Sequence, residues 1–254
     1  MHRTLILISV AAASASAQVN LYSPQQERAL GAGLAAQVRS QSTVVNSITV
    51  NRLVSRVGNK LAAALPDRSR QYTFTVVDRN LGGSTNEPLA LPGGFVFVPV
   101  NLLLAARSED ELAGMLAHAI AHIEARHGTR QATRAQTANL TPAAVVFVSS
   151  PTAADSSPLP PPLSNLERSF EKEADGIAVA IMASAGYDPE ALANYVARLQ
   201  YDTTASPLSA LPSRDERVAA IRVAIQQRPP NEFSAMQVEL HGLLANPAST
   251  PLVK

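Results

Sequence analysis

The sequence has no cysteine and no tryptophan among its 254 residues, and no excess of charge of either sign. Without cysteine, neither a disulfide nor a lipid anchor on cysteine can form, so a hydrophobic core must hold the fold together. The 21 basic and 20 acidic residues are not gathered into the basic cluster that nucleic-acid-binding proteins carry. These absences exclude a disulfide-stapled scaffold and predict a globular protein with no nucleic acid partner.

Long hydrophobic runs are also lacking, because no stretch approaches the roughly 20 apolar residues that a membrane-spanning helix needs. The N-terminal run at residues 4–13 is much shorter, and Ala15-Ser16-Ala17 follows it as a small-x-small cleavage pattern. We interpret residues 1–17 as a signal peptide, with a buried N-terminal helix as the alternative. The protein is therefore predicted to be exported, to the periplasm or outside the cell. The mature chain has no predicted transmembrane segment, and its pattern is compatible with peripheral membrane contact.

Hydrophobic periodicity predicts an α+β fold that is mainly α with one small β-sheet. Helices are expected over residues 23–38, 50–65, 108–127, 166–185, 189–199 and 214–227, and strands over 72–77 and on both sides of a turn within 89–98. Residues 150–163 are rich in proline and serine and are interpreted as a loop within the domain. The expected organisation is one domain at residues 18–228, followed by a short tail at 229–254.

Two histidines four residues apart, His118 and His122, lie on the helix predicted at residues 108–127. Four steps of about 100° bring the second imidazole almost over the first, so one rigid helix could present both to a zinc ion. In projection the pair lies away from the apolar stripe that contains Leu112 and Leu116, which argues against histidines packed in the core. Two surface histidines at a chance spacing are the remaining alternative.

A zinc site of this kind needs a third protein ligand and leaves one position open for water. The candidate is Glu171, in the run Glu171-Lys172-Glu173-Ala174-Asp175 on the next long helix. Asp175 lies four residues along the same face and could accept a hydrogen bond from the free ring nitrogen of a ligating histidine. Without the two histidines, a charge run of this type is better explained as a solvated helix face.

These segments, in this order, resemble the zinc metallopeptidases of peptidase family M48, which includes CAAX prenyl endopeptidases, HtpX and BepA-like periplasmic proteases. The matching segments are residues 23–31, 90–98, 111–128 and 171–189. The resemblance implies that residues 18–228 form a zincin-like metallopeptidase domain with the small sheet beside the metal-binding helix. It also implies one Zn²⁺ ion held by His118, His122 and Glu171, with Asp175 orienting a histidine.

The resemblance further implies where a substrate would bind. An extended or unfolded polypeptide is expected to pair, as an added strand, with the segment that precedes the metal helix. The residues of this segment are Leu89, Ala90, Leu91, Pro92, Gly93 and Gly94.

The sequence departs from the family pattern at Ala119. The family motif is His-Glu-x-x-His, whereas residues 118–122 read His-Ala-Ile-Ala-His. The missing glutamate is the general base that takes a proton from zinc-bound water and passes it to the leaving amine. Leu211 is a second departure, since related proteins carry a histidine there, before a proline. Glu124 projects away from the histidine face and Glu111 is explained as a capping residue, so neither is expected to replace the base.

Three functions are compatible with these residues. The first is an exported endopeptidase acting on misfolded envelope proteins, the second a zinc-binding pseudo-peptidase acting as a chaperone or adaptor, and the third a metal-free helical protein. We predict a zinc metalloendopeptidase whose hydrolysis of peptide bonds is weak or absent because of Ala119, whether that alanine is natural or introduced. Arg126 and His127 are interpreted as structural, and His241 as a surface residue of the tail.

Overall fold

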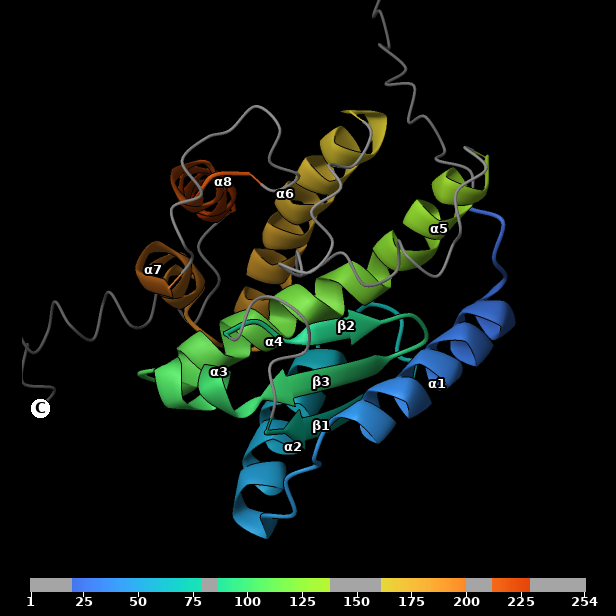
Figure 1. The fold of residues 1–254 in the computed structure, drawn as a ribbon. Coiled ribbons are helices and arrows are strands. Elements are labelled where there is room, and N and C mark those ends of the chain that lie inside the picture. The colour runs from blue at the N-terminus through green and yellow to red at the C-terminus, as the bar shows by residue number, and fades with distance from the viewer. Residues whose placement is uncertain (1–19, 79–85, 138–160, 200–211, 229–254) are drawn as a thin grey trace, which may run out of the picture.

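The computed structural model describes residues 20–78, 86–137, 161–199 and 212–228 (Figure 1). The predicted signal peptide and tail, Leu211, His241 and most of the Pro-rich loop lie outside these residues. The elements in chain order are α1 (Pro24–Gln41), α2 (Ile48–Ala63), β1 (Thr73–Val77), β2 (Leu89–Leu91), β3 (Phe95–Pro99), α3 (Val100–Ala105), α4 (Glu109–Glu124), α5 (His127–Thr137), α6 (Pro161–Ser184), α7 (Glu190–Leu199) and α8 (Arg214–Gln226).

The three strands form a small mixed sheet in the order β1-β3-β2. β1 runs parallel to β3, whereas β2 and β3 form an antiparallel hairpin. The hairpin turn contains Gly93 and Gly94, whose φ angles of 79° and 103° are rarely adopted by residues with a side chain. Within the described part of the chain β2 pairs with β3 alone, so its other edge is open. The predicted α+β class, mainly helical with one small sheet, is confirmed.

The central element of the fold is α4, which lies between the sheet and helices α6, α7 and α8 (Figure 1). Every residue from Glu111 to Ile123 is buried. Our projection predicted a single apolar stripe on this helix, but α4 is covered on several sides because it packs against β2, α2, α6 and α7. A side chain on its histidine face therefore points toward another element and not toward solvent.

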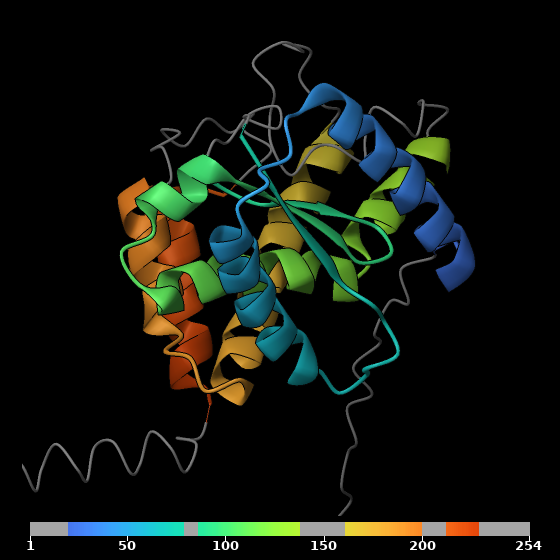
Figure 2. The ribbon, with the colours of Figure 1, turned by 90° about the horizontal axis from the view of Figure 1, so that it is seen from below.

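Helix α1 lies at the opposite end of the molecule from α7 and α8 (Figures 1 and 2). It begins at a capping box, in which the Ser23 side chain accepts from the backbone of Gln26 and the Gln26 side chain accepts from the backbone of Ser23. Its apolar residues, among them Leu34 and Val38, pack with Phe97 in a second core cluster. This packing brings α1 alongside the β2–β3 hairpin.

Gly31 is the point of closest approach between α1 and this hairpin. A Cβ atom on Gly31 would lie 1.7 Å from the backbone oxygen of Pro92, whereas a Cβ on Gly33 of the same helix would meet nothing within 4 Å. We expect Gly31→Ala to destabilise the fold by about 1–3 kcal/mol, because the hairpin would have to move. Gly33→Ala should be neutral or stabilise by up to about 1 kcal/mol. Chemical denaturation measures both effects, and an unchanged midpoint for Gly31→Ala would contradict this contact.

The end of α4 differs from the prediction. The helix expected to continue to His127 ends at Glu124, and α5 begins at His127. Between the two helices Arg126 has a φ of 58°, in the left-handed region that glycine usually occupies. Glu27 of α1 accepts a hydrogen bond from Arg126 Nε at 2.7 Å. The turn was expected at Gly128, but a tertiary contact allows an arginine to make it two residues earlier.

Two other boundaries were not predicted. The short helix α3 follows β3 directly, and α6 begins at Pro161, inside the segment interpreted as a loop. Proline is well tolerated in the first turn of a helix, where its missing N–H has no helical partner to lose. Among the helices that the structure describes, none combines the length and apolar content needed to cross a bilayer.

Candidate metal centre

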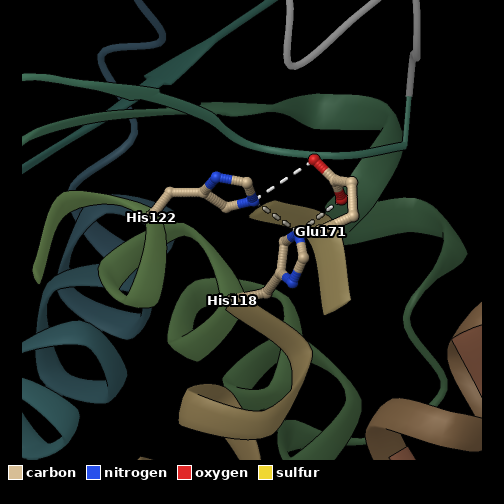
Figure 3. A group of neighbouring side chains, drawn as sticks. All are labelled: His118, His122 and Glu171. Carbon is tan, nitrogen blue, oxygen red and sulfur yellow. Dashed lines mark hydrogen bonds and ion pairs between the residues drawn. The ribbon is translucent and has the colours of Figure 1, made fainter. Parts of the chain in front are cut away.

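Three donor groups from two helices converge in the interior of the fold (Figure 3). His118 and His122 project from α4 and Glu171 from α6. The two Nε2 atoms lie 3.0 Å apart, and Glu171 oxygens lie 3.3 Å from His118 Nε2 and 3.4 Å from His122 Nε2. Tetrahedral zinc with bonds of about 2.0–2.2 Å separates neighbouring ligand atoms by roughly 3.3–3.6 Å. The three residues therefore form a group that could hold a metal ion.

Burial separates this group from a chance surface cluster. The exposed fractions of His118, His122 and Glu171 are 5%, 8% and 6%. Burying three polar side chains without partners is costly, so such groups are normally paired with one another or with a metal. His118 and His122 are therefore not surface histidines at a chance spacing, and Glu171 is not part of a solvated helix face.

The ring of His118 is held by Asp175, one turn after Glu171 on α6. His118 Nδ1 lies 2.9 Å from Asp175 Oδ1, and the aspartate is fully buried. A proton on Nδ1, donated to the carboxylate, leaves the Nε2 lone pair facing Glu171 and His122. The contact therefore selects the tautomer of His118 that a metal ion requires.

The ring of His122 is held by His127, the first residue of α5. Their Nδ1 atoms lie 3.0 Å apart. His127 in turn stacks on Phe170, with ring centroids 4.2 Å apart, and its Nε2 lies 3.2 Å from Glu173 Oε2. His127 reaches this place because the left-handed turn at Arg126 redirects the chain. The sequence predicts only a structural role for His127, because the sequence pattern does not reveal that turn.

Arg217 of α8 is a buried member of the site that sequence reasoning missed. Its guanidinium donates to both oxygens of Asp175, at 2.9 and 2.7 Å. The same side chain is only 2% exposed, and its Nη1 lies 3.3 Å from Glu87 Oε1 and 3.9 Å from Glu171 Oε2. The only signal in the sequence is a charged residue within a helix that also has an apolar face, and this pattern does not distinguish a buried arginine from an exposed one.

The charges around the donor group favour an anionic Glu171 and a neutral His122. Burial opposes ionisation of Glu171, but the two histidines and Arg217 lower its pKa to about 2. Burial lowers the pKa of His122 to about 4. Burial and Arg217 also act against a charged His118, yet its hydrogen bonds to Asp175 and Glu171 raise its pKa to about 9. A ligating Nε2 must be unprotonated, so a metal ion that bound there would displace the Nε2 proton of a charged His118.

Position 119 offers only a methyl group. Ala119 is 1% exposed and belongs to the main core cluster. The two other glutamates of interest on α4 are engaged elsewhere. Glu111 Oε2 accepts from Arg198 Nη2 at 2.6 Å, and Glu124 Oε1 accepts from the Tyr72 hydroxyl at 2.6 Å. Neither side chain is available as a proton acceptor beside the histidines.

A cleft connects the donor group with the open edge of the sheet. Its lining includes Ala90, Leu91 and Pro92 from the β2 hairpin together with His122 and Glu171. An extended chain that lay along β2 would thus pass the donor group.

The rest of the segment expected to bind a substrate lies apart from this cleft. Leu89 packs in the second core cluster, and Gly93 and Gly94 form the hairpin turn. A Cβ on Gly93 would lie 2.6 Å from the Cα of Arg28, so this turn is pressed against α1.

The sequence profile of peptidase family M48 matches residues 49–225, a range that contains both donor helices and Arg217. The chain belongs to peptidase family M48. It is similar to a candidate beta-barrel assembly-enhancing protease of Vibrio cholerae, with 31% identity over 81% of this chain and 45% of that protein. A beta-barrel assembly-enhancing protease of Yersinia pestis is 26% identical over 84% of this chain and 46% of its own length. Mitochondrial metalloendopeptidase OMA1 of Schizosaccharomyces pombe is 34% identical over 42% of this chain and 32% of its own.

Membership of the M48 family confirms the resemblance inferred from the four motifs, and with it the zincin-like fold. The chain spans about half the length of the two beta-barrel assembly-enhancing proteases that it matches. The M48 profile covers the helix with the donor histidines and also the position of Ala119. The departure at residue 119 thus lies within an otherwise recognisable peptidase domain.

Proposed function

We propose that this M48 chain is an exported zinc metallopeptidase domain that binds extended polypeptides and hydrolyses them slowly. The observation that carries the proposal is the convergence of two imidazole nitrogens and one carboxylate at separations that suit zinc. Two histidines and one glutamate are a ligand set of catalytic zinc sites, in which the fourth position is left for water.

The residues of this chain would hold the ion and orient its ligands. His118, His122 and Glu171 would bind one Zn²⁺, and Asp175 fixes the His118 ring while Arg217 fixes Asp175. When bound, zinc lowers the pKa of its water to around 7 and polarises a peptide carbonyl. The pairing of His118 with Asp175 and of His122 with His127 would hold the two rings in place for the ion.

The open edge of β2 supports an extended polypeptide as the substrate. A chain added to a sheet edge is held through its backbone, so its binding depends little on sequence. Such a site suits unfolded or misfolded proteins. The names of two relatives refer to beta-barrel assembly, which supports envelope proteins as the substrate class and, together with the predicted signal peptide, the periplasm as the place of action.

Hydrolysis is slow in this proposal because Ala119 cannot accept a proton. A positioned acid–base group contributes about 10²–10⁴-fold to a rate of this kind. The same residue favours a second function, in which the domain holds polypeptides as a chaperone or adaptor and does not release cut products. Both functions require the zinc site and the cleft.

Metal analysis tests the zinc site directly. We expect the purified chain to carry stoichiometric zinc, and Glu171→Gln to lose most of it, because a neutral amide is a poorer ligand than a carboxylate. Glu173→Gln, two residues along the same helix, should keep the metal. Elemental analysis gives the content, and zinc binding should raise the melting temperature of the wild type but not of Glu171→Gln. A wild-type protein without zinc would leave only the metal-free alternative.

A further inference from the structure

Glu27 is a buried carboxylate of α1 that contacts the turn between α4 and α5. The residue is 1% exposed. Its Oε1 accepts hydrogen bonds from Arg126 Nε at 2.7 Å and from the Thr129 hydroxyl, and its Oε2 lies 3.6 Å from Arg70 Nη1. Both hydrogen bonds therefore come from the turn or from the first residues of α5. The proposed function leaves this carboxylate unused.

The turn at Arg126 needs such support. Among the described residues Arg126 is the one non-glycine residue with a positive φ, at 58°. A Cβ atom disfavours this conformation, so contacts elsewhere must stabilise it. The Arg126 guanidinium supplies them, since it binds Glu27 and also donates to the backbone oxygen of Tyr22, two residues before α1. The start of α1 thus holds the turn in place.

The chain that leads into α1 also holds the start of α5. Asn20 Nδ2 donates to Thr129 Oγ1 at 2.9 Å, and the backbone nitrogen of Leu21 donates to Thr133 Oγ1 at 3.1 Å. These pairs are 109 and 112 residues apart in the sequence. Both threonines are buried, so the hydroxyls are fixed within the fold. The position of α5 therefore depends on the same segment that carries Glu27.

His127 is the residue that the turn places beside the donor group. It follows Arg126 directly, and its Nδ1 lies 3.0 Å from His122 Nδ1. When His122 binds a metal ion through Nε2, its ring proton is on Nδ1 and is donated to His127. A displaced His127 would leave this buried proton without its acceptor and would free the His122 ring to rotate.

We propose that Glu27 is a positioning residue of the metal centre, which acts on His122 through Arg126 and His127. The carboxylate fixes the guanidinium, the guanidinium stabilises the left-handed turn, and the turn holds the His127 ring against His122. Glu27 contacts neither of the donor histidines, so its effect is on how tightly and in what geometry the metal is held. This inference rests on the proposed function, because it requires that His122 binds zinc.

Metal binding by the purified full chain tests this role. Replacing Glu27 with alanine removes both hydrogen bonds, and we expect the zinc affinity to fall about tenfold, the lower end of the 10–100-fold cost of losing a partner that orients a ligand. Competition with a chromophoric chelator measures the affinity. Co²⁺ is the spectroscopic probe, because its visible absorption depends on the geometry of its ligands. At saturating Co²⁺ the spectrum of Glu27→Ala should differ from that of the wild type.

Glu111→Ala is the matched control for a general loss of stability. Glu111 is also a buried glutamate, 7% exposed, and it accepts from Arg198 Nη2 at 2.6 Å. Its replacement breaks a comparable buried ion pair on the helix that carries the histidines. The melting temperature of metal-free protein should therefore fall in both variants. The zinc affinity and the cobalt spectrum of Glu111→Ala should stay as in the wild type.

Replacing Arg126 with glycine tests the path from Glu27 to the histidines. Glycine adopts a positive φ without steric cost, so the turn no longer depends on a side-chain contact. In the Glu27→Ala background, Arg126→Gly should therefore restore most of the lost zinc affinity and the wild-type cobalt spectrum. A positioning role predicts this recovery, whereas a purely structural role of the ion pair does not.

The other outcomes overturn the inference. An unchanged affinity and spectrum in Glu27→Ala would show that Glu27 does not position the site, and an equal loss in Glu111→Ala would show a general effect of stability. A double variant without recovery would reject the path through the turn. If Glu27→Ala does not fold, Glu27→Gln, which removes only the charge, takes its place in the same comparisons. A wild type that binds neither Zn²⁺ nor Co²⁺ would instead reject the proposed function, so the two failures are distinguishable.

Discussion

Replacing Ala119 with glutamate is expected to raise kcat for peptide hydrolysis by about 10²-fold. Positioned acid–base catalysis contributes about 10²–10⁴-fold, and the lower part of this range applies because residue 119 is closely packed, so an added side chain must displace its neighbours. Residue 119 follows the proposed zinc ligand His118 on α4. It is also the position at which the family motif His-Glu-x-x-His carries its general base. A discontinuous assay on zinc-loaded protein, with cleavage products separated by chromatography, measures the gain.

Ala119→Gln is the matched control for this gain. Glutamine has nearly the same volume as glutamate but cannot accept the proton, so it should show no increase. Position 119 is 1% exposed, and both variants should therefore share an overpacking cost of about 1–3 kcal/mol. An equal gain with glutamine would mean that the added bulk, and not the base, alters the rate. A folded, zinc-loaded Ala119→Glu that stays slow would show that the missing base does not limit catalysis.

The parts of the site that could be predicted are those governed by helical spacing. His118 and His122 are four residues apart, as are Glu171 and Asp175, and a regular helix places such pairs on one face whatever surrounds it. The hairpin within residues 89–98 was likewise signalled by its own turn glycines. These features depend on local geometry, which neighbouring residues in the sequence determine.

The parts that were missed depend on contacts between distant segments. Arg217 reaches Asp175 only because α8 packs against α6, and no residue near Arg217 in the sequence indicates this. His127 meets His122 because Arg126 adopts a left-handed turn, which Glu27 supports from about a hundred residues earlier. The burial of the histidine face of α4 was missed for the same reason. A projection shows which residues share a face but not what covers it.

Replacing Arg217 with methionine should destabilise the fold by about 3–5 kcal/mol, because it leaves the charge of Asp175 buried without its cation. Asp175 is fully buried, and two of its hydrogen bonds come from Arg217. For a domain of this size the loss corresponds to a drop in melting temperature of roughly 6–20 °C. Methionine keeps much of the apolar volume, so the effect reports mainly on the lost charge and hydrogen bonds. Thermal unfolding of metal-free protein measures it without a contribution from zinc.

Arg222→Met provides the control on the same helix. Arg222 forms an ion pair with Glu190 at 2.9 Å, but its side chain is 50% exposed, and such pairs contribute about 0–1 kcal/mol. Combining Arg217→Met with Asp175→Asn should cost less than the sum of the two single changes, since the second removes the charge that the first leaves unpaired. Equal stability losses for Arg217→Met and Arg222→Met would contradict a buried ion pair that anchors α8 to α6. A strictly additive double variant would show that Arg217 and Asp175 act independently, and His118 would then depend on Asp175 alone.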